Sequence, residues 1–128
     1  NDLPVTIHSR NSHKDCIEIV SKYVGKLKGV FHSFTGNIDE AKEIMDLGFP
    51  IGINGIITYS SAQTLRDIII ELIKGTKIAS PEDLYNLGIF LETDSPFLIP
   101  SNIQNRKKYN SPESIKFIWE FVYNLLNQ

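Results

Sequence analysis

Four short apolar runs, separated by longer segments with helical periodicity, constrain the fold of this chain more than any other feature. The runs cover residues 4–8, 29–33, 49–54 and 87–93, and each has the length of a buried strand. Between and after them, apolar residues recur three and four positions apart, as on the buried side of an amphipathic helix. Because strands that alternate with helices form βαβ units, the sequence predicts an α/β fold with a parallel sheet.

The predicted helices have recognisable boundaries. Asn37 and Glu40 have the spacing of a capping box, and Gly48 is typical of the end of that helix. Further helices are predicted to begin at Ser61 and Ser80, and a last one begins at Ser111-Pro112-Glu113. The first helix is expected to bury a stripe that consists of Cys16, Val20, Tyr23, Val24 and Leu27. The last helix is expected to bury Ile115, Ile118, Trp119, Val122 and Leu126.

Composition excludes several classes of protein. Thirteen Lys and Arg residues against 15 Asp and Glu give a formal charge of −2, which excludes a strongly basic protein that wraps nucleic acid. The basic run Arg106-Lys107-Lys108 is predicted to be a solvated loop. The single cysteine, Cys16, cannot form an internal disulfide or a thiolate zinc site, which fits a reducing compartment. No apolar run approaches 18 residues and no signal peptide is visible, so we expect a cytoplasmic protein with no membrane partner.

Each apolar run ends in a polar residue that a core strand does not need: His8, His32, Asn54 and Asp94. The carboxyl ends of the strands carry the active site in parallel α/β folds, above all in barrels. His8 and His32 are 24 residues apart, and His32 and Asn54 are 22 apart, which matches one crossover each. Two imidazoles and the Asp94 carboxylate suit a divalent ion that keeps open positions for water. Such an ion would lower the pKa of bound water and polarise a phosphoryl or carbonyl oxygen.

Most of these residues also have a structural interpretation, and their spacing alone leaves both open. A histidine at a strand end is often a hydrogen-bonded residue of the rim, and His13, in the first turn of a helix, suits capping or exposure. Arg10 can hold a substrate phosphate through two hydrogen bonds or pair with Asp15 on the surface. Glu92, which alternates with Asp94 and is expected on the same side of the strand, can orient a ligand or form a paired inward-facing acid.

Four segments, taken together, resemble motifs of the TatD family of metal-dependent deoxyribonucleases. They occur in the family's order and extend over nearly the whole chain: LPVTIHSR at 3–10, GVFHSFTG at 29–36, GFPIGING at 48–55 and LETDSPFL at 91–98. The resemblance implies a TIM barrel of the metallo-dependent hydrolase type, which has about 250 residues. The family's first metal motif, His-x-His, and its bridging Glu have no counterpart in the chain. Residues 1–128 are therefore expected to be the C-terminal half of a TatD-like barrel domain, roughly from the fourth strand onward.

The resemblance also implies roles for individual residues. His8 and His32 correspond to metal ligands, and Asp94 corresponds to a ligand that also activates the attacking water. Glu92 corresponds to a second acidic residue of the catalytic site. Arg10 and Asn54 are the residues expected to bind substrate.

The expected activity is hydrolysis of phosphodiester bonds in DNA, as an exonuclease that acts from 3′ ends. Mg²⁺ is the expected ion, with Zn²⁺ or Mn²⁺ as alternatives, and the expected partner is single-stranded DNA or a 3′ end. A homodimer or the missing N-terminal half would close the barrel, and the chain alone is expected to be weak or inactive. Two alternatives stay open: an amidohydrolase-type metal hydrolase with another substrate, and a non-catalytic half barrel that binds a partner.

Overall fold

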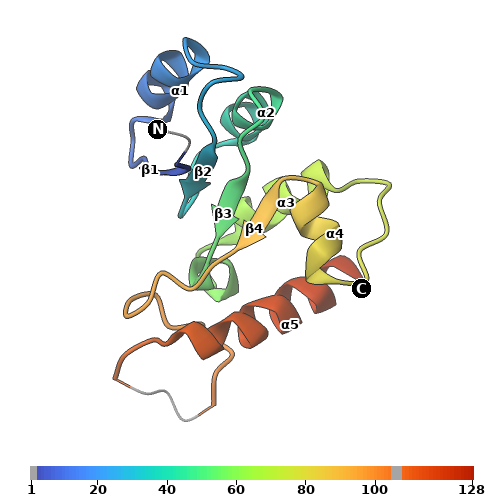
Figure 1. Cartoon of the computed structure of the whole chain (residues 1–128). Helices are drawn as coiled ribbons and strands as arrows, with labels where there is room; N and C mark the ends of the chain where they lie inside the picture. Colours follow the sequence, from blue (N-terminus) through green and yellow to red (C-terminus); the bar gives the residue numbers. More distant parts are fainter. Residues whose placement is uncertain (1–2, 105–107) are drawn as a thin grey trace.

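The four predicted strands form one parallel sheet in the computed structural model, which describes residues 3–104 and 108–128 (Figure 1). The strands are β1 (Val5–His8), β2 (Gly29–His32), β3 (Ile51–Ile53) and β4 (Ile89–Leu91). Their order in the sheet, β1-β2-β3-β4, is their order in the sequence, as in the wall of a (β/α) barrel. The predicted α/β fold of a partial barrel is confirmed.

Helices follow the strands and lie around the sheet, α1 and α2 near β1 and β2, and α4 and α5 beside β4 (Figure 1). The α-helices are α1 (His13–Ser21), α2 (Ile38–Asp46), α3 (Gln63–Leu72), α4 (Pro81–Asn86) and α5 (Ile115–Leu126). Two 3₁₀ helices accompany them, η1 (Gly55–Thr58) and η2 (Pro112–Ser114). In the described part of the chain, no helix has the length and apolar character needed to cross a membrane.

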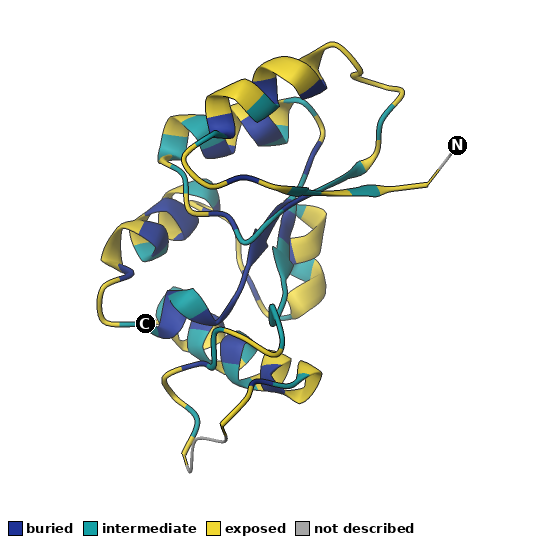
Figure 2. Cartoon of the chain, turned by 90° about the vertical axis from the view of Figure 1, so that its left-hand side faces the viewer, coloured by how far each residue is buried: buried dark blue, intermediate teal, exposed yellow. Residues whose placement is uncertain are grey.

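The core lies between the sheet and the helices. β3 is buried along its whole length, as expected for an inner strand of a parallel sheet with both faces covered. Figure 2 shows the helices buried on the sides that face the sheet and exposed on their outer sides. Ile44 of α2 and Ile118 and Val122 of α5 are at most 1% exposed. Ile115, which was predicted to be buried, is 36% exposed, because it lies at the first turn of α5.

The predicted caps are confirmed at two helices. Asn37 Oδ1 accepts the Glu40 amide at 2.9 Å, Glu40 Oε2 accepts the Asn37 amide at 2.9 Å, and Gly48 follows the helix with φ of +83°. Ser80 and Asp83 form the second capping box, at α4. The predicted start of α3 at Ser61 is wrong. A hydrogen-bonded turn precedes that helix, and no side chain caps it.

The first helix differs most from its prediction. α1 ends at Ser21, and its buried residues are His13, Ile17 and Val20, whereas Tyr23 and Val24 are about half exposed. The buried stripe therefore follows i, i+4, i+7 spacing from His13. It begins nearer the N-terminus than the predicted stripe, which began at Cys16. The His13 side chain is buried, packs edge-to-face on Phe34 and lies 3.8 Å from a carboxylate oxygen of Glu40, so the alternative in which it is exposed is wrong. Of the predicted basic loop, Arg106 and Lys107 lie outside the described residues.

The Asp83 carboxylate gives a stability test of α4, the helix that packs on β4. Hydrogen bonds from the backbone amides of Ala79 and Ser80 lower the pKa of Asp83 below its usual value of 3.8. A lowered pKa in the folded state means that the carboxylate stabilises the fold above pH 4 and loses this effect as the pH falls. We expect Asp83→Asn to lower the free energy of unfolding at pH 7 by urea titration. The difference from the wild type should shrink below pH 4; a constant difference would contradict this.

Candidate functional site

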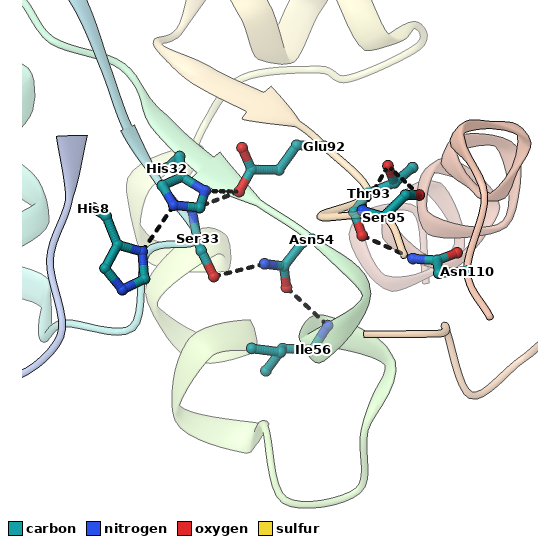
Figure 3. Close-up of polar contacts among 9 residues, drawn as sticks. All are labelled: His8, His32, Ser33, Asn54, Ile56, Glu92, Thr93, Ser95 and Asn110. Carbon is teal, nitrogen blue, oxygen red and sulfur yellow. Dashed lines mark hydrogen bonds and ion pairs between the residues drawn. The ribbon is translucent and has the colours of Figure 1, made fainter. Parts of the chain in front are cut away.

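His8 and His32 lie side by side at the carboxyl ends of β1 and β2. The parallel register pairs them directly, His8 with His32, so that both side chains reach the same edge of the sheet. His8 Nδ1 lies 2.8 Å from His32 Nε2, within hydrogen-bond distance (Figure 3). This confirms that the two strand ends meet at one edge.

A carboxylate lies on the other side of His32. Glu92 follows β4 directly, and its Oε1 atom lies 3.6 Å from His32 Nδ1 while it accepts the amide of Ser33 (Figure 3). Burial raises the pKa of Glu92, and the nearby charge of Asp94 adds to this. The Ser33 amide and His32 act in the opposite direction. Glu92 thus lies beside Nδ1 of His32, while Nε2 of the same ring faces His8. This contact agrees with an acid that orients a histidine, and that role of Glu92 stays a prediction.

Gly52 of β3 provides the space that Glu92 occupies. A Cβ atom at residue 52 would lie 2.7 Å from the Glu92 carboxyl group. We expect Gly52→Ala to push this carboxylate away from Ser33 and His32, with a loss of about 1–2 kcal/mol in stability, because the displaced group is the end of a flexible side chain. The affinity of the His8–His32 pair for a divalent ion should fall about 10- to 100-fold, the usual effect of losing a residue that orients a metal ligand.

A double-mutant cycle with Glu92→Gln checks this explanation. If Gly52→Ala acts through Glu92, it should lower the metal affinity of the Glu92→Gln variant much less than that of the wild type. Fully multiplicative losses would show that residue 52 acts through another contact.

Asn54 holds Ser33, the residue after His32, through a hydrogen bond. Its side chain is 2% exposed, its amide nitrogen donates to Ser33 Oγ at 2.8 Å, and its oxygen accepts the Ile56 amide at 3.1 Å (Figure 3). Ser33 has a positive φ of 53°, which is uncommon for a residue with a side chain. Asn54 therefore positions Ser33 and caps η1, and its contact with substrate stays a prediction.

Asp94 reaches the site from a loop after β4. The strand ends at Leu91, so strand alternation does not extend to Asp94, which has a φ of +53°. It lines a cavity of about 360 Å³, within the range of small-ligand sites. The cavity is also lined by His8, Arg10, Ser33, Phe97 and Leu98.

Arg10 is exposed at this cavity, and among the described residues it has no ion-pair or hydrogen-bond partner. The alternative in which Arg10 pairs with Asp15 is therefore wrong. A guanidinium group without an internal partner keeps its donors for an anionic ligand, and its planar shape suits a phosphate.

The loop that carries Asp94 is held by a residue that the sequence analysis missed. Asn110 is 7% exposed, and its side-chain amide donates to the carbonyl groups of Thr93 at 2.8 Å and Phe97 at 2.6 Å. The backbone amide of Asn110 donates to the Pro96 carbonyl at 3.0 Å. Asn110 therefore connects Thr93, Pro96 and Phe97 of this loop through hydrogen bonds. One signal was available, because Asn110 directly precedes the Ser111-Pro112 helix start.

The donor types suit a divalent ion. Imidazole nitrogens and a carboxylate are common ligands of such ions, and His8 Nδ1 and His32 Nε2 lie close together, 2.8 Å apart. A carboxylate on the second nitrogen of a ligating histidine, as Glu92 is on His32, is the common arrangement around such ligands. In residues 3–104 and 108–128, however, no three His, Cys, Asp or Glu groups are arranged to hold an ion. Asp94 shares a cavity with His8, and its membership of one ligand set with the histidines stays a prediction.

Comparison with known proteins gives relatives with a consistent description. An "Uncharacterized metal-dependent hydrolase" of Haemophilus influenzae is 35% identical over 99% of this chain and 43% of its own length. A "Putative deoxyribonuclease TATDN1 homolog" of Encephalitozoon cuniculi is 42% identical over 70% of this chain and 27% of its own length. The crystal structure of the TatD homologue YjjV from Escherichia coli superposes with a TM-score of 0.74 at 29% identity, over 97% of this chain and 42% of that one.

The chain spans less than half the length of these relatives. The sequence family described as "TatD related DNase" matches residues 1–128, a range that includes all four motifs. The relatives named as metal-dependent hydrolases support a divalent metal ion as the cofactor of the group. The chain belongs to the TatD family of metal-dependent hydrolases.

Proposed function

We propose that this chain forms part of the active site of a hydrolase that cleaves phosphodiester bonds in DNA. The observation that carries the proposal is the His8–His32 pair, backed by Glu92, at the edge of a cavity that Asp94 and Arg10 also line. The cavity itself is lined by the imidazole of His8, the carboxylate of Asp94 and the guanidinium of Arg10. Groups of these three kinds suit phosphodiester hydrolysis.

A divalent ion held by His8, His32 and Asp94 would supply water of lowered pKa and polarise a phosphoryl oxygen. Within the chain, the Asp94 carboxylate accepts a proton from the attacking water, as a general base. The Arg10 guanidinium binds the non-bridging oxygens of the phosphate and offsets the charge that develops on them. Glu92 keeps His32 oriented, and Asn54 fixes Ser33 beneath the cavity.

Several observations support DNA as the substrate. One relative is named a deoxyribonuclease homologue, and the matching family is described as TatD related DNase. Arg10 gives the cavity an unpaired cation for a phosphate, although the whole chain is slightly acidic.

We propose Mg²⁺ as the ion, single-stranded DNA or a 3′ end as the partner and the cytoplasm as the location. We also propose that a second copy or an N-terminal half closes the barrel.

The experiment is degradation of single-stranded oligodeoxynucleotides labelled at the 3′ or the 5′ end, with Mg²⁺ or with EDTA. From the chain alone we expect weak metal-dependent cleavage, in which the 3′ label is released as a mononucleotide first. Release of internal fragments would replace the exonuclease with an endonuclease. Metal-dependent hydrolysis of an amide or lactone, but not of DNA, would favour the amidohydrolase-type alternative. The absence of any metal-dependent turnover would favour a half barrel that binds a partner.

A further inference from the structure

The exposed aromatic ring of Phe97 lies at the edge of the candidate site. The Phe97 side chain is 68% exposed and lines the same cavity as Asp94 and Arg10. Single exposed apolar side chains are common on protein surfaces, so the exposure alone has no functional meaning. Its position is more informative, because Phe97 follows the proposed general base by three residues and borders the space in which the reaction would occur.

The backbone beneath this ring is held on several sides. The Phe97 amide donates to the Asp94 carbonyl at 3.0 Å, and the Phe97 carbonyl accepts the Asn110 side chain at 2.6 Å. On the other side the loop approaches η1 so closely that a Cβ atom at Gly55 would lie 2.1 Å from the Leu98 carbonyl oxygen. The loop thus fixes the position of Phe97 relative to Asp94 while the ring stays open to solvent.

An aromatic face beside a cation suits one class of ligand, an unpaired nucleotide. A nucleobase stacks on an aromatic ring whatever its sequence, because every base has a π-face. The phosphate attached to the same nucleotide requires a cation, and Arg10 lines the same cavity as Phe97. A base inside a duplex is already stacked and must be unstacked at a cost of a few kcal/mol, which favours a single strand or a frayed end.

We infer that Phe97 is a stacking platform for the unpaired base next to the scissile phosphate, and that it gives the site its preference for single-stranded DNA. This inference rests on the proposed function and adds a specificity residue to it. Phe97 binds substrate and takes no part in bond cleavage. Its loss should therefore raise KM and leave kcat nearly unchanged.

The test compares Phe97→Leu, which keeps an apolar side chain without a π-face, with Phe97→Trp and the control Tyr23→Leu. Tyr23 is also exposed, at 51%, but belongs to the turn after α1. Binding of a fluorescein-labelled oligo(dT) is measured by anisotropy in EDTA, where turnover stops, and KM and kcat are measured with Mg²⁺. We expect Phe97→Leu to weaken binding and raise KM about 5- to 150-fold, the usual contribution of one stacked base. The Trp variant and the Tyr23→Leu control should behave like the wild type.

A second probe has an abasic nucleotide in place of the terminal 3′ base. The wild type should bind it as weakly as Phe97→Leu binds oligo(dT), and Phe97→Leu should bind both probes equally. Unchanged binding and KM in Phe97→Leu, with cleavage of DNA retained, would overturn the stacking role and leave the proposed function intact. If the wild type neither binds nor cleaves DNA, the proposed function fails and the stacking role fails with it.

Discussion

Replacing Asp94 with Asn is expected to lower metal-dependent hydrolysis of DNA about 10²- to 10⁴-fold, the range of rate lost with a general base. Asn has nearly the same shape as Asp but cannot accept a proton from water. It is also the substitution that the backbone tolerates best. Asp94 has a φ of +53°, and Asn and Asp are the side chains that most readily adopt this conformation. We therefore expect the melting temperature to stay within about 2 °C of the wild type, because the fold loses no contact in its core.

The control for this prediction is Asp46→Asn. Asp46 is an exposed carboxylate at the end of α2, remote in sequence from the cavity, and its substitution should change neither turnover nor melting temperature. An Asp94→Asn variant that is fully active would remove Asp94 from the proposed mechanism. An equal loss in both variants would show that overall acidity, and not the position of Asp94, supports the activity.

The order of strands and helices was predictable because it depends on periodicity along the chain. His8 and His32 were predictable as neighbours for the same reason, since parallel strands of equal length bring their carboxyl ends to one edge. The buried residues of α1 were predicted wrongly because a short helix can bury only one side, and several apolar residues of this segment could have formed it. Only packing decided that His13 is buried against Phe34 while Tyr23 and Val24 stay exposed.

The residues that support the site were less predictable than its strand-end residues. The contact of Glu92 with His32 depends on the space left by Gly52, and the burial of Asn54 depends on how η1 turns beneath the site. Local sequence patterns do not predict these contacts, because each contact joins residues from different segments of the chain. The hydrogen bonds of the Asn110 side chain are the clearest case, because their acceptors lie in a loop 12 to 17 residues earlier in the chain.

Replacing Asn110 with Asp is expected to have the largest effect on stability. The side-chain amide of Asn110 donates to three carbonyl groups, those of Thr93, Phe97 and Leu98, from a position that is 7% exposed. An ionised carboxyl group would face these acceptors with no proton to donate. We expect a loss of about 3–5 kcal/mol in the free energy of unfolding at pH 7, because the donors to these carbonyl groups are lost and a charge is buried with only the Ser111 amide as its donor.

The pH dependence separates this explanation from a general packing defect. Burial among carbonyl oxygens raises the pKa of the introduced carboxyl group above its value of about 3.9 in the unfolded chain. The penalty is therefore smallest below pH 4, where the group is protonated in both states, and it grows as the pH rises through the raised pKa. The matched control is Asn102→Asp, at an exposed residue with one bond to the Phe117 carbonyl, for which we expect a loss below about 1 kcal/mol. Urea titrations of both variants from pH 4 to pH 8 measure the difference, and a penalty in Asn110→Asp that does not change with pH would contradict this explanation.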